Sequence, residues 1–206
     1  MVPRPFPVFL DLVGRPCVVF GAGPEAQRKI AALLHAGAVV RTATEFDPAF
    51  LRDAALVMVA GASQMTAEAA AAAAQRRGIP INVADEPRLC SFLMPAIVDR
   101  APVVVAISTG GAAPALARQL RIWLEQLLPR RLGELATLAG RFRPLVRRRL
   151  AEPEMRRRFW QDVFTGDIGK RALDGEPAAG ALAAALDEAA AANARPSPPY
   201  SSGSAV

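Results

Sequence analysis

The chemically most suggestive stretch of the sequence is a glycine-rich turn. Gly21-Ala22-Gly23-Pro24-Glu25-Ala26 has the spacing G-x-G-x-x-A and follows directly on the apolar run Cys17–Phe20. Glycines at that spacing, between a strand and a helix, let backbone N–H groups approach a pyrophosphate. Glu45 and Asp47 lie at about the distance at which an acid would bond a ribose hydroxyl, although either could cap a helical turn. The pattern favours dinucleotide binding over an ordinary glycine turn.

Two further stretches place polar groups behind apolar runs. Asp85 follows the run Ile79–Val83, and a carboxylate beyond the carboxyl end of a parallel strand could accept a proton while a hydride leaves. Asp85-Glu86-Pro87 is equally typical of a capped helix start. Ser108-Thr109-Gly110-Gly111 follows the run Val103–Ile107 and could present hydroxyls and amides to an anion, or cap the next helix. At this point both alternatives stay open for both stretches.

Other reactive residue types are sparse. His35 is the only histidine and lies in a predicted helix, so we expect no histidine-based metal site. Cys17 and Cys90 have neither C-x-x-C spacing nor the pattern of a disulfide scaffold, and we expect buried small hydrophobes. The N-terminus lacks the features of a signal peptide, and no apolar run suits a membrane span. We therefore expect a cytoplasmic protein with no membrane partner.

The elements that must position these residues alternate between strand and helix. Unalternating apolar runs indicate a parallel sheet, and the alternation indicates a doubly wound α/β fold. The predicted strands are Cys17–Phe20, Ala38–Thr42, Ala55–Ala60, Ile79–Val83 and Val103–Ile107, and the predicted helices are Glu25–Ala36, Thr66–Arg77 and Pro114–Leu128. From Pro129 onward the pattern is helical and basic.

This pattern divides the chain into three predicted parts. Residues 1–113 form a Rossmann-like dinucleotide-binding domain, and residues 114–175 form a helical region. Residues 176–206 are rich in alanine and then in Pro, Ser and Gly, which predicts a frayed helix and a disordered tail.

Positive charge is concentrated in the helical region. The formal net charge is +6, and residues 118–171 hold 14 Lys and Arg against 6 Asp and Glu. Such an excess suggests an anionic partner, which could be nucleic acid, an acidic membrane surface or a polycarboxylate. The alternative is a solvated helical face.

Several stretches together carry a family resemblance. Before the helical part they are Pro7-Val8-Phe9-Leu10-Asp11-Leu12, the Gly21 turn with Ala26-Gln27-Arg28-Lys29, Asn82-Val83-Ala84-Asp85, Ser91-Phe92-Leu93-Met94-Pro95-Ala96-Ile97-Val98-Asp99-Arg100 and Ser108-Thr109-Gly110-Gly111-Ala112-Ala113-Pro114. In the helical part they are Leu128-Pro129, Leu132-Gly133, Ala139-Gly140 and Arg157-Arg158-Phe159-Trp160. Over about residues 5–172 the chain resembles the precorrin-2 dehydrogenase and sirohydrochlorin ferrochelatase family, the N-terminal module of sirohaem synthase.

The resemblance implies a homodimer that oxidises precorrin-2 to sirohydrochlorin with NAD as hydride acceptor, and in some members inserts iron at the same site. Asp85 matches the carboxylate implicated in both steps. The resemblance places Pro24, Glu25, Thr44 and Glu45, with the Gly21 turn, on the cofactor side, and Asn82, Ser108, Thr109, Gly110 and Gly111 on the substrate side. A polycarboxylate substrate would explain the basic helices without nucleic acid, and the helical region would serve dimerisation and tetrapyrrole binding.

The chain also departs from this family. Between Thr44 and Glu45 it is shortened by about one helix and one strand, so strands 2 and 3 are connected briefly and the adenosine side of the pocket is expected to differ. Gly61-Ala62-Ser63 replaces the usual Ala-Thr-Asp/Asn run. The methyltransferase module of trifunctional members is absent, so this chain is not expected to make precorrin-2.

Two other functions are consistent with the sequence. The shortened segment would suit a catalytically inactive relative that binds a tetrapyrrole or dinucleotide as a sensor or carrier. The arginine-rich helices would suit nucleic-acid binding, but few aromatics lie among them and no known recognition motif is present. We therefore expect no nucleic-acid partner.

Overall fold

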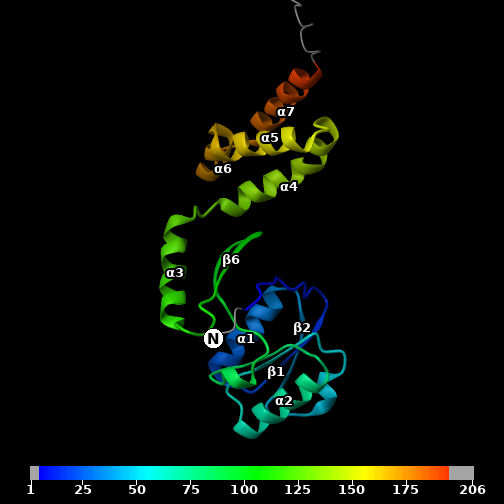
Figure 1. The fold of residues 1–206 in the computed structure, drawn as a ribbon, viewed down its shortest axis with the longest axis vertical. Helices are drawn as coiled ribbons and strands as arrows, with labels where there is room; N and C mark the ends of the chain where they lie inside the picture. The colour runs from blue at the N-terminus through cyan, green and yellow to red at the C-terminus, as the bar shows by residue number, and fades with distance from the viewer. Residues whose placement is uncertain (1–4, 195–206) are drawn as a thin grey trace, which may run out of the picture. The chain divides into compact units, whose positions relative to one another are not determined.

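A computed structural model describes residues 5–194, and their contacts divide them into two compact units. The first unit combines residues 5–96 with 107–119, and the second combines residues 97–106 with 120–194. The first holds the parallel sheet, and the second holds most of the C-terminal helices (Figure 1).

The sheet of the first unit has four parallel strands, β1 (Pro16–Phe20), β2 (Val39–Ala43), β3 (Leu56–Val59) and β4 (Ile81–Val83). Their order is β2-β1-β3-β4. The chain thus leaves β1 toward one side of the sheet and returns on the other side with β3. Because the winding direction reverses between β1 and β3, their carboxyl ends form the switch point at which open α/β sheets bind ligands.

Helices cover both faces of this sheet (Figure 1). Val18 and Phe20 of β1 point to one face, into a core shared with α2 (Gln64–Arg76). Cys17 and Val19 point to the opposite face, where they pack with residues of α1 (Gly23–His35). The alternation of side chains along a strand produces these two cores, and the predicted doubly wound fold is confirmed.

The connection from β2 to β3 is short, as the sequence predicts. It contains only η1 (Pro48–Leu51), a 3₁₀ turn. Phe46 and Phe50 flank Phe20 with ring-centroid distances of 5.6 and 6.1 Å, and Leu51 is buried beside them. These side chains provide apolar cover on the α2 face close to the short connection, where a longer crossover would otherwise contribute a helix.

Two strands lie outside the main sheet. β5 (Ala96–Arg100) and β6 (Val103–Ile107) form a separate two-stranded sheet, joined by Ala101 and Pro102. The sequence predicts β6 but not β5, because β5 ends in two charged residues that interrupt its apolar pattern. Residues 97–106 of this hairpin belong by their contacts to the second unit.

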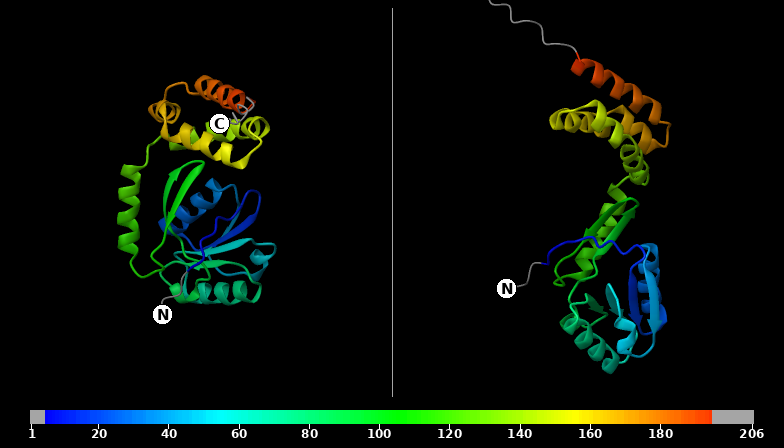
Figure 2. Two further views of the ribbon diagram at one scale, coloured as in Figure 1. Left: turned by 45° about the horizontal axis from the view of Figure 1, so that its top comes forward. Right: turned by 90° about the vertical axis from the view of Figure 1, so that its right-hand side faces the viewer.

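The second unit is helical apart from the hairpin. It contains the C-terminal part of α3 (Pro114–Leu127), and α4 (Leu132–Arg149), α5 (Pro153–Thr165), α6 (Asp167–Asp174) and α7 (Ala179–Ala194). α4, α5 and α7 enclose an apolar core, and α6 packs against α4 and α5 (Figure 2). The buried residues of this core are Val146, Leu150, Phe159, Val163, Leu182 and Leu186.

The sequence predicts a frayed helix followed by a disordered tail over residues 176–206, and the structure has a packed helix over residues 179–194. They form helix α7, in which Leu182 and Leu186 are fully buried against α4 and α5. The composition is misleading because alanine contributes little to a hydrophobic pattern, so two leucines four residues apart decide where the helix docks. Residues 195–206, the rest of the predicted tail, lie outside the described residues.

Candidate active site

The glycine-rich turn joins β1 to α1, as predicted. The backbone takes positive φ angles at Gly21 (112°) and Gly23 (86°), which glycine adopts without steric cost. Pro24 lies in the first turn of α1, and Ala22 precedes the helix without a capping side chain. The first N–H groups of α1 therefore lack a side-chain acceptor, and together with the helix dipole they favour a bound anion.

Two glycines at this edge are required by packing. A Cβ atom on Gly21 would lie 1.9 Å from the carbonyl oxygen of Ala60, and one on Gly61 would lie 2.1 Å from that of Ala22. The turns after β1 and β3 thus approach each other closely, and Ala22 N–H donates to the Gly61 carbonyl at 3.3 Å.

Gly23 differs from both of these glycines. A Cβ atom there would meet no heavy atom within 4 Å, so open space lies beside the first turn of α1. An open, uncapped helix start with room beside its glycine fits the pyrophosphate of a dinucleotide.

The structure separates the two acidic candidates behind β2. Asp47 Oδ1 accepts a hydrogen bond from Ala49 N–H at 2.8 Å and caps η1. Glu45 is exposed and has no hydrogen bond or ion pair among residues 5–194. Thr44 is also exposed, and it follows Ala43, whose carbonyl accepts from Gly21 N–H at 2.8 Å. Thr44 and Glu45 therefore lie next to the glycine turn, and of the two acids Glu45 is the one free to contact a ribose.

Asp85 lies just beyond β4 in an unusual backbone conformation. Its φ is +61°, a left-handed value that is uncommon outside glycine and that Asp and Asn tolerate best. The carboxylate is exposed, and no other group among residues 5–194 bonds to it. The capping alternative is not supported, because Glu86 is the residue that precedes η2 (Pro87–Leu89), and no side chain caps that turn. A free carboxylate at a strand end suits a proton acceptor.

The predicted anion loop Ser108-Thr109-Gly110-Gly111 makes local bonds. Thr109 Oγ1 accepts from Ala113 N–H at 3.1 Å, just before α3, and Ser108 Oγ accepts from Gly110 N–H at 3.1 Å. Thr109 thus bonds the N–H of the residue that directly precedes α3, and Ser108 closes a turn within the loop. Gly110 and Gly111 have φ angles of 65° and 84°, and space is open beside Gly111. Its contact with a substrate stays a prediction.

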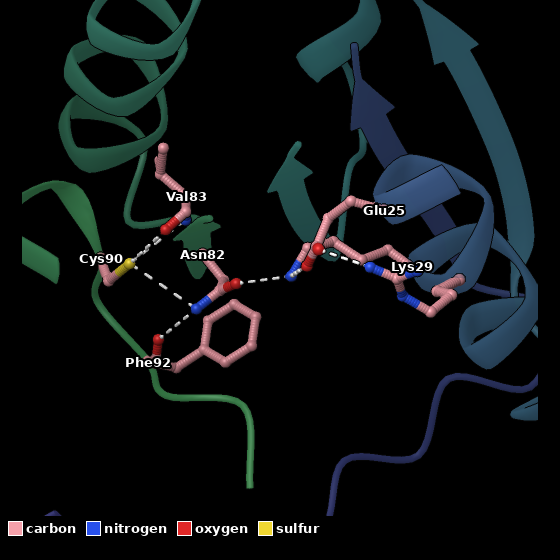
Figure 3. A network of polar contacts seen from close by, with 7 residues as sticks. Glu25, Lys29, Asn82, Val83, Cys90 and Phe92 are labelled. Carbon is pink, nitrogen blue, oxygen red and sulfur yellow. Dashed lines mark hydrogen bonds and ion pairs between the residues drawn. The ribbon is translucent and has the colours of Figure 1, made fainter. Parts of the chain in front are cut away.

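A buried polar network joins α1 to β4 (Figure 3). Ile81 and Val83 belong to the core on the α2 face, so Asn82 between them points to the α1 face. There Lys29 Nζ donates to Asn82 Oδ1 at 3.1 Å and lies 3.9 Å from Glu25 Oε1. Lys29 and Asn82 are only 9% and 7% exposed. The amide of Asn82 is thus engaged within the chain.

The same network holds the segment after β4. Asn82 Nδ2 donates to the Phe92 carbonyl at 3.1 Å, and Val83 N–H donates to Cys90 Sγ at 3.2 Å (Figure 3). Ser91 bonds to the backbone of Ile81 through its N–H (2.8 Å) and its hydroxyl (2.8 Å). We call residues 84–90 the Asp85 loop, since these bonds fasten its far end to β4.

Sequence reasoning missed Lys29, Cys90 and Gly61. Lys29 was identifiable as a cation three residues after core-facing Ala26 and four before Leu33, and Asn82 as a polar residue inside an apolar strand. Gly61, directly behind a buried strand, carries the signal of a close backbone approach. Cys90 is half-buried and hydrogen-bonded, not the buried small hydrophobe that the sequence predicts, because its thiol bonds depend on how the loop folds back.

The arginine clusters of α4 and α5 are partly engaged within the chain. Arg149 pairs with Asp187, Arg156 donates to the carbonyls of Leu150 and Ala151, and Arg157 and Arg158 bond to Glu154. The hydrogen bond from Arg157 lowers the pKa of Glu154. Arg147 and Arg148 are exposed, and no residue among 5–194 pairs with them.

Residues 5–194 contain neither a cluster of metal ligands nor a helix suited to spanning a membrane. No group of three or more His, Cys, Asp or Glu side chains there could hold a metal ion. No helix in the same range is long and apolar enough to cross a membrane. Cys17 is buried in the sheet, and burial raises the pKa of its thiol.

Two family models match the chain. The model described as "Sirohaem synthase dimerisation region" matches residues 131–192. The model described as "Putative NAD(P)-binding" matches residues 8–46 and 39–96, two stretches that overlap around the short connection behind β2.

Sirohaem synthases are similar to most of the chain. Those of Methylobacillus flagellatus and Nitrosospira multiformis are each 42% identical over 82% of this chain and 41% of their own length. That of Methylococcus capsulatus is 41% identical over 89% of this chain and 44% of its length. The chain therefore spans about two fifths of these relatives.

A solved structure shares the fold. The structure of "SirC, precorrin-2 dehydrogenase" matches with a TM-score of 0.64 and 19% sequence identity. The match covers 89% of this chain and 99% of that one. It supports a Rossmann-like domain followed by a helical region.

Proposed function

This chain belongs to the precorrin-2 dehydrogenase and sirohydrochlorin ferrochelatase family that forms the N-terminal module of sirohaem synthase, and on that basis we propose that it oxidises precorrin-2 to sirohydrochlorin. The observation that carries the proposal lies at one edge of the parallel sheet. An open, uncapped helix start follows β1, and an unpaired carboxylate follows β4 at the same carboxyl edge. A dinucleotide site and a proton acceptor are what this oxidation requires.

The residues of the glycine turn would hold the cofactor, which we propose to be NAD. The uncapped N–H groups of α1 bind the pyrophosphate, Gly23 leaves room for it, and Glu45 bonds a ribose hydroxyl. NAD, when bound, supplies the hydride acceptor. Glu45 disfavours NADP, since its carboxylate would repel a 2′-phosphate.

Asp85 would act as the base. The oxidation removes two hydrogens from the substrate, one as a hydride and one as a proton, and the proton passes to the Asp85 carboxylate. The exposure of this carboxylate and its lack of a partner among residues 5–194 leave it available. Ser108, Thr109, Gly110 and Gly111 would offer amides to a substrate carboxylate, and the Gly110 N–H would exchange its present bond to Ser108 Oγ for this contact. Direct contact with Asn82 would require its present bonds to be exchanged.

We further propose that the chain is a homodimer. A two-stranded hairpin is marginally stable alone, and its strand edges invite pairing. The β5–β6 hairpin exposes Ile97 and Val104, and α3 exposes Trp123 and Leu127. The family model of a dimerisation region matches residues 131–192, and a second copy that binds there would extend its contact onto these preceding apolar side chains. Light scattering coupled to size-exclusion chromatography should give twice the chain mass of 21.8 kDa.

Turnover of precorrin-2 is the decisive experiment. The purified protein is mixed with precorrin-2 and NAD, and NADH and sirohydrochlorin are followed by their absorbance. We expect the two products in equal amounts. Binding of NAD and precorrin-2 without turnover would instead identify an inactive sensor or carrier.

A further inference from the structure

Lys29 occupies an unusual position for a lysine. It is 9% exposed, in the second turn of the helix whose start would bind the cofactor. A buried ammonium is costly unless it is paired and hydrogen-bonded. Here Asn82 Oδ1, at 3.1 Å, is its hydrogen-bond acceptor, and Glu25 is a more distant ion partner at 3.9 Å. Arg28 shares Glu25, at 2.7 Å, so Glu25 is not dedicated to Lys29.

The contact that Lys29 makes is a bridge between two parts of the site. Asn82 lies three residues before Asp85, and its Nδ2 group donates to the carbonyl of Phe92, beyond the far end of the Asp85 loop. Cys90 and Ser91 fasten the same end to Val83 and Ile81. Both ends of the loop are thus fixed to β4. Asn82, which takes part in these bonds, is also connected to α1 through its hydrogen bond with Lys29 (Figure 3).

The other contacts of the Asp85 loop come from its backbone, such as the bond from Ala84 N–H to the Val59 carbonyl, and from Leu89 and Cys90, which pack against the core on the α2 face. Asp85 is held in a left-handed conformation, and its side chain contributes no hydrogen bond to any residue among 5–194. The orientation of the Asp85 carboxylate is therefore determined by the backbone of the loop and by the bonds that fix the loop to β4. Any contact that shifts β4 relative to α1 would move the Asp85 carboxylate relative to the glycine turn.

We propose that Lys29 is a positioning residue that couples dinucleotide binding at α1 to the order of the Asp85 loop. The inference rests on the proposed function and goes beyond it, because it assigns a role to a residue that would touch neither cofactor nor substrate. Dinucleotide binding at the start of α1 restricts the motion of this helix. The hydrogen bond from Lys29 to Asn82 extends the restriction to β4, the strand that precedes Asp85. A positioned base is worth far more than a loose one, since a misplacement of about 1 Å can cost about a hundredfold in rate.

Amide hydrogen exchange tests the coupling without turnover. In the parent protein, saturating NAD should slow exchange in peptides covering residues 84–92 as well as at the glycine turn. In Lys29→Met, which removes the ammonium but keeps the length of the stem, NAD should bind within about threefold of parental affinity. It should then protect the glycine turn only. Lys29→Gln, which is too short to span the same gap, is the second variant should Lys29→Met fail to fold.

Kinetics provide the second readout. Lys29→Met should lower kcat at least about tenfold with little change in KM for NAD, and Lys29→Arg should recover part of kcat. Arg28→Met is the matched control, since it removes an exposed charge from the same helix without touching Asn82. It should keep both kcat and the protection pattern.

The outcomes separate this inference from the proposed function. If the parent turns over precorrin-2 but NAD protects residues 84–92 equally in Lys29→Met, or protects them in neither protein, Lys29 does not couple the two sites and only the inference fails. If the parent fails to bind NAD, the proposed function is wrong and the inference falls with it.

Discussion

At the scale of single residues, the backbone of Asp85 determines which substitutions are informative. Its φ of +61° suits Asp, Asn and Gly, whereas most other side chains cost roughly 1–2 kcal/mol in this conformation. We therefore expect Asp85→Asn to melt near the parental temperature and to bind NAD normally. Its dehydrogenase rate should fall at least about a hundredfold, since Asn cannot accept a proton. Calorimetric titration, thermal melting and NADH formation measure the three quantities.

Asp85→Gly is the control for this experiment. It also lacks the carboxylate, but it relieves the left-handed strain, so both variants should be inactive although their backbones differ in stiffness. Parental turnover in a stable Asp85→Asn protein would show that the base lies elsewhere.

Cofactor preference depends on the acid that remains free behind β2. Glu45→Gln removes the charge that would face a 2′-phosphate, and we expect the ratio of NADP to NAD affinity to rise roughly tenfold, which corresponds to about 1.4 kcal/mol. Asp47→Asn is the matched control, because Asn caps η1 about as well as Asp. Fluorescence titration measures the Kd values for NAD and for NADP in each variant. An equal change of the affinity ratio in Glu45→Gln and Asp47→Asn would contradict the assignment to Glu45.

The sequence predicts single residues well only where a local pattern exists. Gly21, Gly23 and Asp85 are recognisable because a turn or a strand end precedes or follows them along the chain. The Lys29–Asn82 pair is separated by 53 residues, and its formation depends on which face of β4 points to α1. A local pattern can identify each polar residue as unusual, but it cannot pair them.

At the scale of elements, the glycine turn allows folding and binding to be separated. Gly23→Val has open space for its Cβ atom, although its φ of +86° is strained for valine, so we expect a folded protein with moderately reduced stability. Its side chain would occupy the space assigned to the pyrophosphate, and NAD binding should be lost. Unchanged NAD affinity in titration would refute the phosphate site.

Gly21→Ala provides the contrast, because its Cβ atom would lie 1.9 Å from the Ala60 carbonyl. We expect this variant to be more destabilised in urea than Gly23→Val, although it adds the smaller side chain.

Helix α7 provides a stability test of the second unit. Leu186→Ala removes a fully buried side chain from the core with α4 and α5, and should cost about 2–5 kcal/mol in the free energy of unfolding. Ala184→Ser, at an exposed position of the same helix, should cost much less. Equal urea midpoints for the two variants would show that α7 is not part of this core.

The elements were predictable in proportion to the length and purity of their apolar patterns. β1, β3, α1 and α2 lie within two residues of their predicted bounds. β5 was missed because Asp99 and Arg100 interrupt its apolar pattern, whereas its partner β6 is an unbroken apolar run. The docking of α7 was missed because an alanine-rich helix has little hydrophobic contrast between its faces.

At the scale of the whole molecule, the arginine clusters divide into engaged and free side chains. Arg147→Glu with Arg148→Glu reverses two charges that have no partner among residues 5–194. This double variant should weaken tetrapyrrole binding or dimerisation more than it changes NAD affinity. Arg157→Glu with Arg158→Glu reverses charges that Glu154 already balances at the surface, and should do less. If neither double variant alters binding or mass in solution, the clusters are only a solvated face.

The closely packed turns after β1 and β3 also determine which glycines of the motif can be substituted during evolution. Gly21 and Gly61 are demanded by the chain's own backbone, so a descendant that lost its cofactor would still have to keep both in order to fold. Position 23 is under no such packing demand, and after loss of the cofactor its left-handed backbone would be free to drift to Asn or Asp. The residue at position 23, rather than the glycine-rich motif as a whole, therefore records whether a lineage still uses a dinucleotide.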